Sequence, residues 1–326
     1  MAVMIRVIIC THNGVRFLEA QLASIMNQNR SIDVVHLFDF ASSDGTRELL
    51  GELTSRWPKL DVRMVSCAPG VTLSFFHAFA QIAPQCGADD TIFLSDQDDI
   101  WLPNKTERML DCLNRGRREG EDRLLVFHDV QICDAALQPL RQSFYEGRPF
   151  ALPQDLATDR LLIANPVIGH TVAITKPLLD IALSCLRPRY YAMHDWALVL
   201  VAAHAGKIVY ISEQLGLYRQ HEMNILGAAR KRSMGDYIKR GIRLSRTIGI
   251  QTSAFVEDFC CIARAARITN PTPILPGRGP LAWRLGLVMA RRGHTIGHRL
   301  MAIVQLKRVL WRGKTLKNSE NRSKGR

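Results

Sequence analysis

A short apolar run that leads directly into three carboxylates constrains this chain more than any other feature. Residues 92–95 are apolar or small, and Asp96, Asp98 and Asp99 follow within four positions. The run predicts a buried strand of a parallel sheet, so the carboxylates follow its carboxyl end, where open α/β sheets bind ligands. Because like charges this close repel each other, a divalent cation such as Mg²⁺ or Mn²⁺ would stabilise them. The alternative is an acidic surface turn that also caps the next helix.

Strand and helix patterns alternate through the first 130 residues. Apolar runs typical of strands lie at 4–10, 34–39, 62–66, 91–95 and 124–128. Helical periodicity lies between them at 16–27, 46–56, 72–83 and 104–117, where Thr46 and Asn104 are candidate caps. Further patterns predict a strand at 170–175, a helix at 194–205 and short strands at 208–211 and 215–219. This alternation indicates βαβ units and an α/β fold with a mostly parallel sheet flanked by helices.

The net charge of +13 is unevenly distributed. Residues 230–326 contain 22 Lys and Arg against 4 Asp and Glu, a net charge of +18, so residues 1–229 carry −5. We therefore predict a domain at 1–228, a basic helical extension at 229–313 and a disordered tail at 314–326. The extension implies an anionic partner such as phospholipid or nucleic acid.

The basic extension has helical patterns at 233–267 and 281–311, separated by Pro and Gly residues. Trp283 and its apolar neighbours stand beside arginines, which suits a helix lying in a membrane interface with anionic lipid. The alternative is a solvated charged face of a helical hairpin packed on the domain. The sequence contains no stretch of 18 uncharged apolar residues, so we predict no transmembrane helix. The first residues lack the pattern of a signal peptide.

Eight cysteines are scattered without a Cys-x-x-Cys pair. Several lie within apolar runs, so we expect buried free thiols in a reducing cytosol rather than disulfides or a zinc site.

Six short motifs, taken in order, resemble those of the family 2 glycosyltransferases. They are Thr-His-Asn-Gly at 11–14, Ser-Ser-Asp-Gly-Thr at 42–46, the acidic segment at 94–105, Asn-Pro-Val-Ile-Gly at 165–169, His-Asp-Trp at 194–196 and Tyr-Arg-Gln-His at 218–221. The resemblance covers about residues 3–225 and is greatest to the bacterial rhamnosyltransferase-like branch. It implies the GT-A fold, a Rossmann-like fold of nucleotide-diphospho-sugar transferases.

The resemblance assigns the acidic segment to the family's Asp-x-Asp motif. Asp96 would then lie near the nucleoside, and Asp98 would bind the divalent cation that bridges the donor's diphosphate. Asp99 is better explained as a supporting residue or helix cap. His221 would complete the metal site or touch the diphosphate, unless it is structural, and Arg219 suits phosphate.

The first two turns resemble the family's nucleotide-binding entrance. Thr11 would approach the nucleoside, and Asn13 would allow a tight turn, although an ordinary strand-to-helix turn is the alternative. Asp39 matches the first of two adjacent aspartates of the family, whereas Phe40 replaces the second, which contacts the nucleoside in relatives. Phe40 would either stack on a base or belong to the core.

The resemblance places the catalytic base at Asp195, which would take the proton of the acceptor hydroxyl. The alternative is that Asp195 only caps its helix. Gly169, His194 and Trp196 would lie on the acceptor side. His128, at the end of a predicted strand, would line that side or form a buried pair with Asp129.

The resemblance implies an inverting, metal-dependent glycosyltransferase. It would move a sugar, rhamnose being one candidate, from a dTDP- or UDP-sugar to a cell-surface polysaccharide or lipid-linked glycan. It would work in the cytoplasm, peripherally at the inner face of the plasma membrane, without binding nucleic acid. One alternative is a catalytically degenerate scaffold at the membrane, and Phe40 would be the first sign of that loss. A nucleotidyltransferase is a second alternative, but this chain lacks the Gly-rich basic loop of such enzymes. A third is a nucleic-acid binder, but no motif that recognises nucleic acid accompanies the basic charge.

Overall fold

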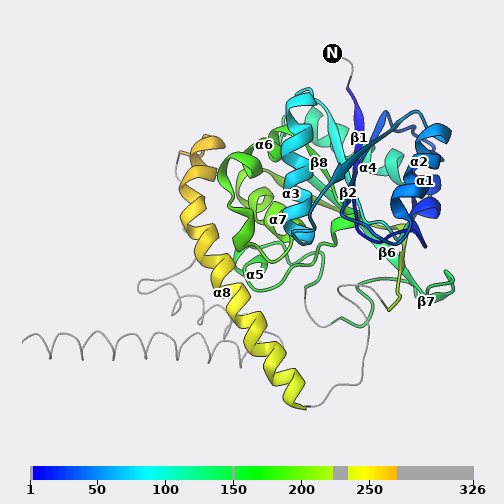
Figure 1. Cartoon of the computed structure of the whole chain (residues 1–326). Coiled ribbons are helices and arrows are strands. Elements are labelled where there is room, and N and C mark those ends of the chain that lie inside the picture. Colours follow the sequence, from blue (N-terminus) through cyan, green and yellow to red (C-terminus); the bar gives the residue numbers. More distant parts are fainter. Residues whose placement is uncertain (1–2, 149–150, 223–233, 270–326) are drawn as a thin grey trace, which may run out of the picture.

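The computed structural model describes residues 3–148, 151–222 and 234–269. One sheet runs through this part of the chain (Figure 1), in the strand order β3-β2-β1-β4-β8-β6-β9-β5, with β7 paired to β6. The strands are β1 (Ile5–Thr11), β2 (Val34–Phe40), β3 (Leu60–Val65), β4 (Thr91–Ser95), β5 (Ile100–Trp101), β6 (Leu124–Cys133), β7 (Pro139–Arg141), β8 (Ala173–Thr175) and β9 (Lys207–Arg219). The strands β1 to β4 pair in parallel, and so do β6 and β9. The short strand β8 joins the two groups antiparallel to both, so all six long strands end at the same edge.

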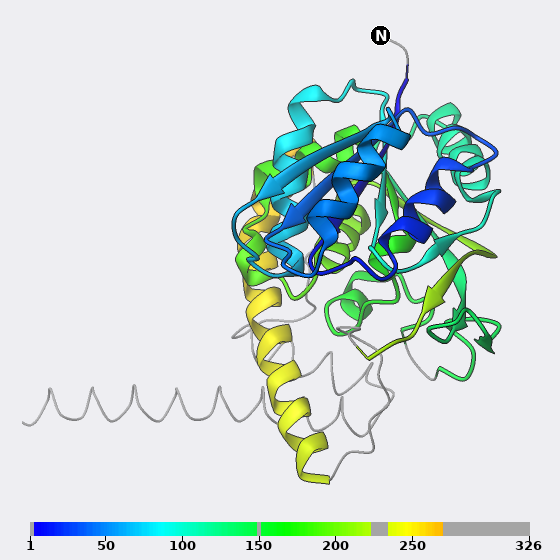
Figure 2. The same cartoon turned by 45° about the vertical axis from the view of Figure 1, so that its right-hand side comes forward.

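Helices cover both faces of the sheet (Figures 1 and 2). They are α1 (Leu18–Met26), α2 (Thr46–Arg56), α3 (Val71–Ile82), α4 (Lys105–Arg118), α5 (Thr158–Leu161), α6 (Lys176–Cys185), α7 (His194–Ala205) and α8 (Met234–Ala265). Alternate strand residues face opposite sides, as a pleated strand requires. Ile8 and Leu94 join one core with α3, α6 and α7, while Val7 and Phe93 join the other core with α1, α2 and α4.

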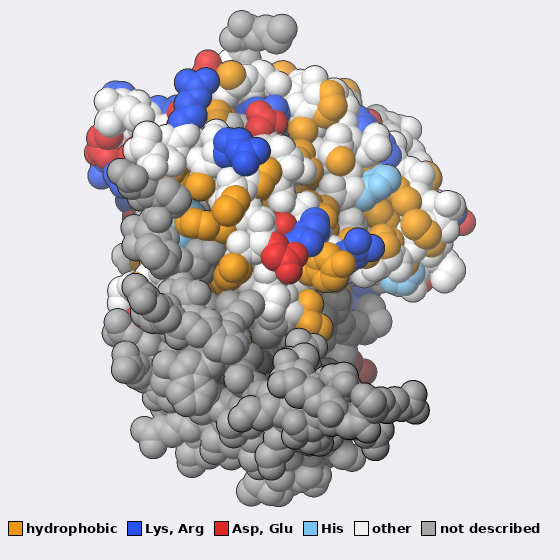
Figure 3. All heavy atoms as spheres, turned by 90° about the vertical axis from the view of Figure 1, so that its left-hand side faces the viewer, with side chains coloured by type: hydrophobic (Ala, Val, Ile, Leu, Met, Phe, Trp, Pro, Cys, Tyr) orange, Lys and Arg blue, Asp and Glu red, His pale blue; other side chains and the backbone are white. Residues whose placement is uncertain are grey.

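The helix α8 packs on the domain through its second half. Ile248, Phe255 and Ile262 are buried in the same core as α6 and α7. Asp258 adds polar contacts, because its carboxylate accepts hydrogen bonds from Arg187 and from the Tyr191 hydroxyl. In Figure 3 the described part of this side of the molecule mixes apolar, basic and acidic side chains. No helix in the described ranges combines the length and apolarity needed to span a bilayer.

Most predicted elements are confirmed within a few residues, and the differences come from tertiary contacts. The two short strands predicted at 208–211 and 215–219 form one strand, β9, because it pairs with β6 along nearly its whole length. The helix predicted at 281–311 lies outside the described residues, and so do 314–326 and the boundary near 229.

The predicted helix caps were wrong in detail. Thr46 is the first residue of α2 rather than its cap, and its N–H donates to the Asp44 carboxylate instead. Asn104 does precede α4, but its side chain makes no capping hydrogen bond.

The prediction that the cysteines are free thiols was wrong for one pair. Cys185 at the end of α6 and Cys261 in α8 form a disulfide, with 5.5 Å between their Cα atoms. They are 76 residues apart in sequence, and only the packing of α8 on α6 brings them together. The sequence spacing therefore could not reveal the pair. The other six cysteines are free, but of these only Cys133 is buried, and Cys67 and Cys260 are exposed, so the predicted burial was also wrong for most of them.

Candidate active site

A cavity of about 580 Å³ lies at the edge where the parallel strands end. The ends of β1, β2, β4 and β9 reach it, as do the first turns of α3 and α7. Because parallel strands share one carboxyl edge, residues that are 200 positions apart in sequence converge there. Of the predicted site residues, the cavity lining contains Thr11, Asn13, Asp96, Asp98, Gly169, His194, Asp195 and His221.

Asp98 faces His221 across the cavity entrance. Its Oδ2 lies 2.8 Å from Nε2 of His221. Burial, reinforced by the charges of Asp99 and Asp96, raises the pKa of Asp98 to about 8. Arg219 stabilises the loop that carries Asp98, because its Nε donates to the Asp98 carbonyl oxygen at 2.8 Å. Arg219 is buried against the ring of Phe17 and does not line the cavity.

Asp99 belongs to a buried network rather than to the cavity wall. Its Oδ1 accepts the Arg219 backbone N–H at 3.0 Å, and its Oδ2 lies 2.8 Å from Nδ1 of His170. The same His170 nitrogen is 3.4 Å from Asp96. Burial opposes protonation of His170, but Asp99 and Asp96 outweigh it and raise the pKa of His170 to about 9. Asp99 thus has the supporting role that we predicted.

Two groups of side chains are candidates for holding a divalent cation. Potential ligand atoms of Asp96, Asp99 and His170 lie within 4.8 Å of one another. However, Asp99 and His170 are buried and do not line the cavity, whereas Asp98 and His221 line it together. Burial lowers the pKa of His221, which favours the neutral imidazole that a metal ligand requires. The Asp98 side of the cluster therefore fits a cation better.

Asp195 stands in the first turn of α7 and faces the same cavity. Asn165 donates to its Oδ1 at 3.2 Å, and the backbone N–H groups of Trp196 and Gly169 also donate to the carboxylate. Burial nevertheless raises the pKa of Asp195 to about 7. A carboxylate with a pKa near neutrality is suited to accept a proton.

His194, directly before Asp195, is buried against Phe75. The two rings stack with centroids 3.7 Å apart. Gly169 lies beside them, and a Cβ there would come within 2.7 Å of Nε2 of His194. Trp196, by contrast, points away from the cavity lining and donates its indole N–H to the Leu161 carbonyl oxygen.

The turn after β1 is held tightly against the acidic loop. The Thr11 hydroxyl donates to Oε1 of Gln97 at 2.6 Å, and the His12 N–H donates to the same oxygen. Asn13 adopts the left-handed conformation, with φ of 51°. At Gly14 a Cβ would lie 2.6 Å from the Thr11 hydroxyl oxygen, so this close approach requires glycine. The turn is therefore more constrained than an ordinary strand-to-helix turn.

Asp39 lies elsewhere than the resemblance suggested, whereas Phe40 agrees with both readings given for it. Asp39 is fully buried below the cavity, where its Oδ2 accepts hydrogen bonds from Arg47 and the Ser42 N–H. It supports the loop and does not line the cavity. Phe40 is one of the lining residues of the cavity, and its ring is buried in the core against His77.

Several lining residues were missed by sequence analysis. They include Gln97, Phe75, Ser74 and Met193. Gln97 could have been found, since it stands between two predicted ligands, but Phe75 lies in an apolar helix and carried no signal. His128, predicted at the acceptor side or in a buried pair, is buried, and its Nδ1 lies 2.6 Å from the Asp129 carbonyl oxygen.

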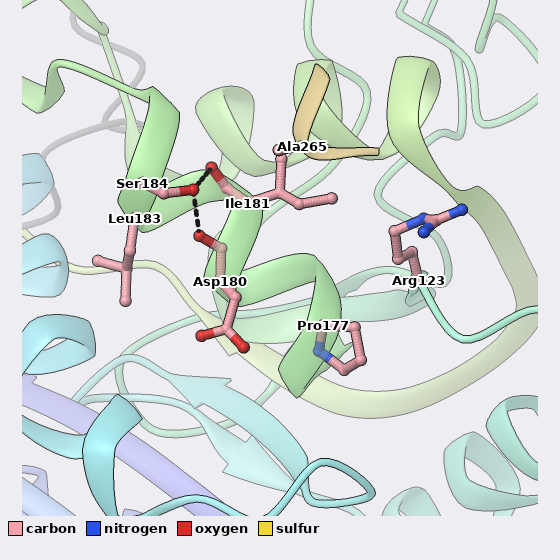
Figure 4. Close-up of a pocket in the computed structure, with 7 residues that line it drawn as sticks. All are labelled: Arg123, Pro177, Asp180, Ile181, Leu183, Ser184 and Ala265. Atoms are coloured by element: carbon pink, nitrogen blue, oxygen red, sulfur yellow. Dashed lines mark hydrogen bonds between the residues drawn. The ribbon is translucent and has the colours of Figure 1, made fainter. Parts of the chain in front are cut away.

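A second hollow, of about 620 Å³, lies between α6 and the end of α8. Its two charged side chains, Arg123 and Asp180, stand on opposite sides of the close-up (Figure 4). The Asp180 carboxylate is already paired with Lys176. The hollow therefore brings no set of reactive groups together.

Comparison with known proteins finds glycosyltransferases. Residues 6–126 match the profile described as Glycosyl transferase family 2. The dTDP-rhamnosyl transferase RfbG of Shigella flexneri is 26% identical over 227 residues, which cover 67% of this chain and 73% of that protein. An uncharacterised glycosyltransferase of Nostoc is 24% identical over 225 residues, covering 68% of this chain and 66% of that protein, just under two thirds.

A solved structure supports the fold assignment alone. The mannosyltransferase PcManGT from Pyrobaculum calidifontis, in complex with GDP-Man and Mn²⁺, superposes with a TM-score of 0.50 at 15% identity. The superposition covers 94% of this chain and 80% of that one. The fold is that of the GT-A glycosyltransferases. Residues 6–126 are similar to glycosyltransferase family 2, and the relatives of 24–26% identity carry glycosyltransferase names.

Proposed function

We propose that the protein transfers a sugar from a nucleotide-sugar donor to an acceptor hydroxyl, with inversion and with the help of a divalent cation. One observation carries the proposal. A single cavity holds the Asp96, Asp98 and His221 cluster and, on another wall, the buried carboxylate of Asp195. The first group suits a diphosphate with its cation, and the second suits proton abstraction.

In this proposal the metal-binding residues and the catalytic base have separate roles. Asp98 and His221 would hold Mg²⁺ or Mn²⁺, which would neutralise the charge that develops on the leaving diphosphate. Asp195 would accept the proton of the acceptor hydroxyl as that oxygen attacks the sugar. Its hydrogen bonds to Asn165 and to the Gly169 N–H keep the carboxylate oriented toward the cavity. Attack by the acceptor opposite the leaving group inverts the sugar carbon.

The donor proposed here is a dTDP- or UDP-sugar, with rhamnose favoured by the Shigella relative, which is named as a dTDP-rhamnosyl transferase. We further propose that the acceptor is a cell-envelope glycan or lipid-linked glycan and that the protein works peripherally at the cytoplasmic face of the membrane. The net charge of +18 over residues 230–326 supports this placement.

The proposal is tested by nucleoside diphosphate release from dTDP-rhamnose, UDP-GlcNAc and GDP-mannose, each with Mn²⁺ and with EDTA. We expect release from one donor, loss of release in EDTA and a loss of at least 10²-fold in Asp98→Asn. Asp134→Asn, a half-buried turn carboxylate outside the cavity lining, is the matched control and should retain full release. If no donor binds or reacts in the presence of Mn²⁺, the proposed function is wrong.

A further inference from the structure

The loop that leads into the proposed catalytic base is held by α8, a helix that lies far from it in the sequence. Residues 186–193 join the end of α6 to the start of α7, where Asp195 stands in the first turn. The helix α8 lies outside residues 6–126, which match the glycosyltransferase profile, and none of its described side chains lines the cavity. Its packed half nevertheless contacts this loop through several side chains.

Gln251 of α8 makes the contact that is nearest to the base in the sequence. The side chain is buried, and its Oε1 accepts the backbone N–H of Ala192 at 2.9 Å. On the other side of the same residue, the Thr72 hydroxyl donates to the Ala192 carbonyl oxygen at 3.1 Å. Because Thr72 belongs to the first turn of α3, the helices α8 and α3 together fix both backbone polar groups of Ala192.

Two further residues of the same loop are attached to α8. The Tyr191 hydroxyl donates to Oδ2 of Asp258 at 2.9 Å, and Nε of Arg187 donates to Oδ1 of the same carboxylate at 2.8 Å. Tyr191 and Asp258 are both buried, so these hydrogen bonds are shielded from water and are stronger than exposed ones. The loop is thus attached to α8 at residues 187, 191 and 192.

The attachment at Ala192 lies three residues before the reactive carboxylate. Met193 follows it and lines the cavity, and its carbonyl oxygen accepts the N–H of Ala197 in the first turn of α7. A shift of Ala192 should therefore move the start of α7, and the Asp195 carboxylate with it. Catalytic groups must be held within about 0.5 Å of the productive geometry, and a misplacement of about 1 Å can lower a rate by about 10²-fold.

We propose that Gln251 is a positioning residue that acts through Ala192 to hold Asp195 at the cavity. The inference rests on the proposed function, because it concerns the base of that reaction. Gln251 lies outside the cavity lining, so its loss should lower kcat and leave the KM for the donor nearly unchanged. Asp98 and His221, which would bind the cation of the donor's diphosphate, belong to the loop after β4 and to the segment after β9.

Gln251→Met is the informative variant, because Met has a similar length and volume but no oxygen for the Ala192 N–H. We expect kcat to fall about 10-fold, while the KM for the donor stays within twofold of wild type. Amide hydrogen exchange of the peptide 188–196 should be faster in this variant. Tyr191→Phe removes a second contact with α8 and keeps the ring, so it should lower kcat in the same direction.

Thr252→Val and Ile262→Val are the matched controls in α8. Thr252 follows Gln251, is equally buried, and has a hydroxyl without a partner among the described residues. Its replacement should leave kcat, KM and hydrogen exchange of the loop unchanged. Ile262 is buried in the core about three turns further along the helix, so the loss of one methyl group should lower Tm without lowering kcat.

Diphosphate release from the donor that wild-type protein uses, with octyl glycosides as acceptor probes, gives kcat and KM for each variant. The inference is overturned if Gln251→Met keeps kcat within twofold of wild type, if KM rises as much as kcat falls, or if Ile262→Val loses as much kcat. Equal hydrogen exchange of the loop in Gln251→Met and wild type also overturns it, and this measurement needs no donor. If wild-type protein turns over no donor, the proposed function is wrong and so is the positioning role, even where exchange detects the contact between Gln251 and the loop.

Discussion

Replacing Asp195 by Asn should affect stability and activity in opposite directions. Burial raises the pKa of Asp195 from an ordinary value of 3.8 to about 7. A difference of roughly three units at 1.36 kcal/mol per unit means that ionising this carboxyl costs the folded state about 4 kcal/mol at pH 8. Asn is neutral and similar in shape, so Asp195→Asn should raise the free energy of unfolding by roughly 2–4 kcal/mol. The lower end of this range allows for the hydrogen bonds that the carboxylate accepts and the amide loses.

The pH dependence follows from the sign of the shift. Because the folded protein binds this proton more tightly than the unfolded chain, the destabilisation by Asp195 is absent below about pH 4 and complete above about pH 7. The stability gain of the variant should therefore shrink to roughly half by pH 5. Turnover should fall by about 10²-fold or more above about pH 7, where the wild-type carboxylate is ionised and can accept the proton, and by less at lower pH. In wild-type protein, turnover should rise as the pH increases through about 7.

Urea unfolding of wild type and Asp195→Asn at pH 8 and pH 5, beside diphosphate release, measures both effects. Asp258→Asn is the control, because Asp258 is equally buried but paired with Arg187, so this variant should lose stability. A variant of Asp195 that is less stable than wild type at pH 8, or whose gain does not depend on pH, would refute the reasoning from burial. Near-normal turnover would exclude Asp195 as the base.

Two further predictions concern parts of the chain outside the cavity. Cys185→Ser should lower the free energy of unfolding by about 4 kcal/mol, since the bond to Cys261 closes a loop of 76 residues. Calorimetry with and without reductant measures this, and equal Tm values for wild type in both conditions would contradict it. The whole chain should sediment with anionic liposomes but not with neutral ones, and should not bind DNA at physiological salt. Equal sedimentation with both liposomes would argue against an electrostatic membrane contact.

The sequence predicted the central part of the fold well because its signals there are local. Local patterns alone predict the strands β1, β2 and β4 and the helices between them, because hydrophobic periodicity does not depend on residues far away in the sequence. The same reasoning failed at β9, which looked like two short strands. The two segments form one continuous strand because they pair with β6, which lies more than 80 residues away in the sequence. A local pattern cannot predict that pairing.

The site shows the same division between local and distant information. Asp98 and His221 were predicted together, and the structure places them 2.8 Å apart. Asp39 was predicted beside the nucleotide but lies below the cavity, because Arg47 holds its carboxylate there. The difference arises from a side-chain contact between two elements, which spacing along the chain cannot show.

The sequence by itself determined the order of the elements, the acidic loop at the end of β4 and the residue types that the chemistry needs. These depend on hydrophobic periodicity and on which residues follow a strand. Only the tertiary structure decided that Asp195 is buried, that His194 stacks on Phe75 and that Cys185 meets Cys261. Burial and partnership are properties of what packs around a side chain, and here the packing residues come from helices and loops far away in the chain.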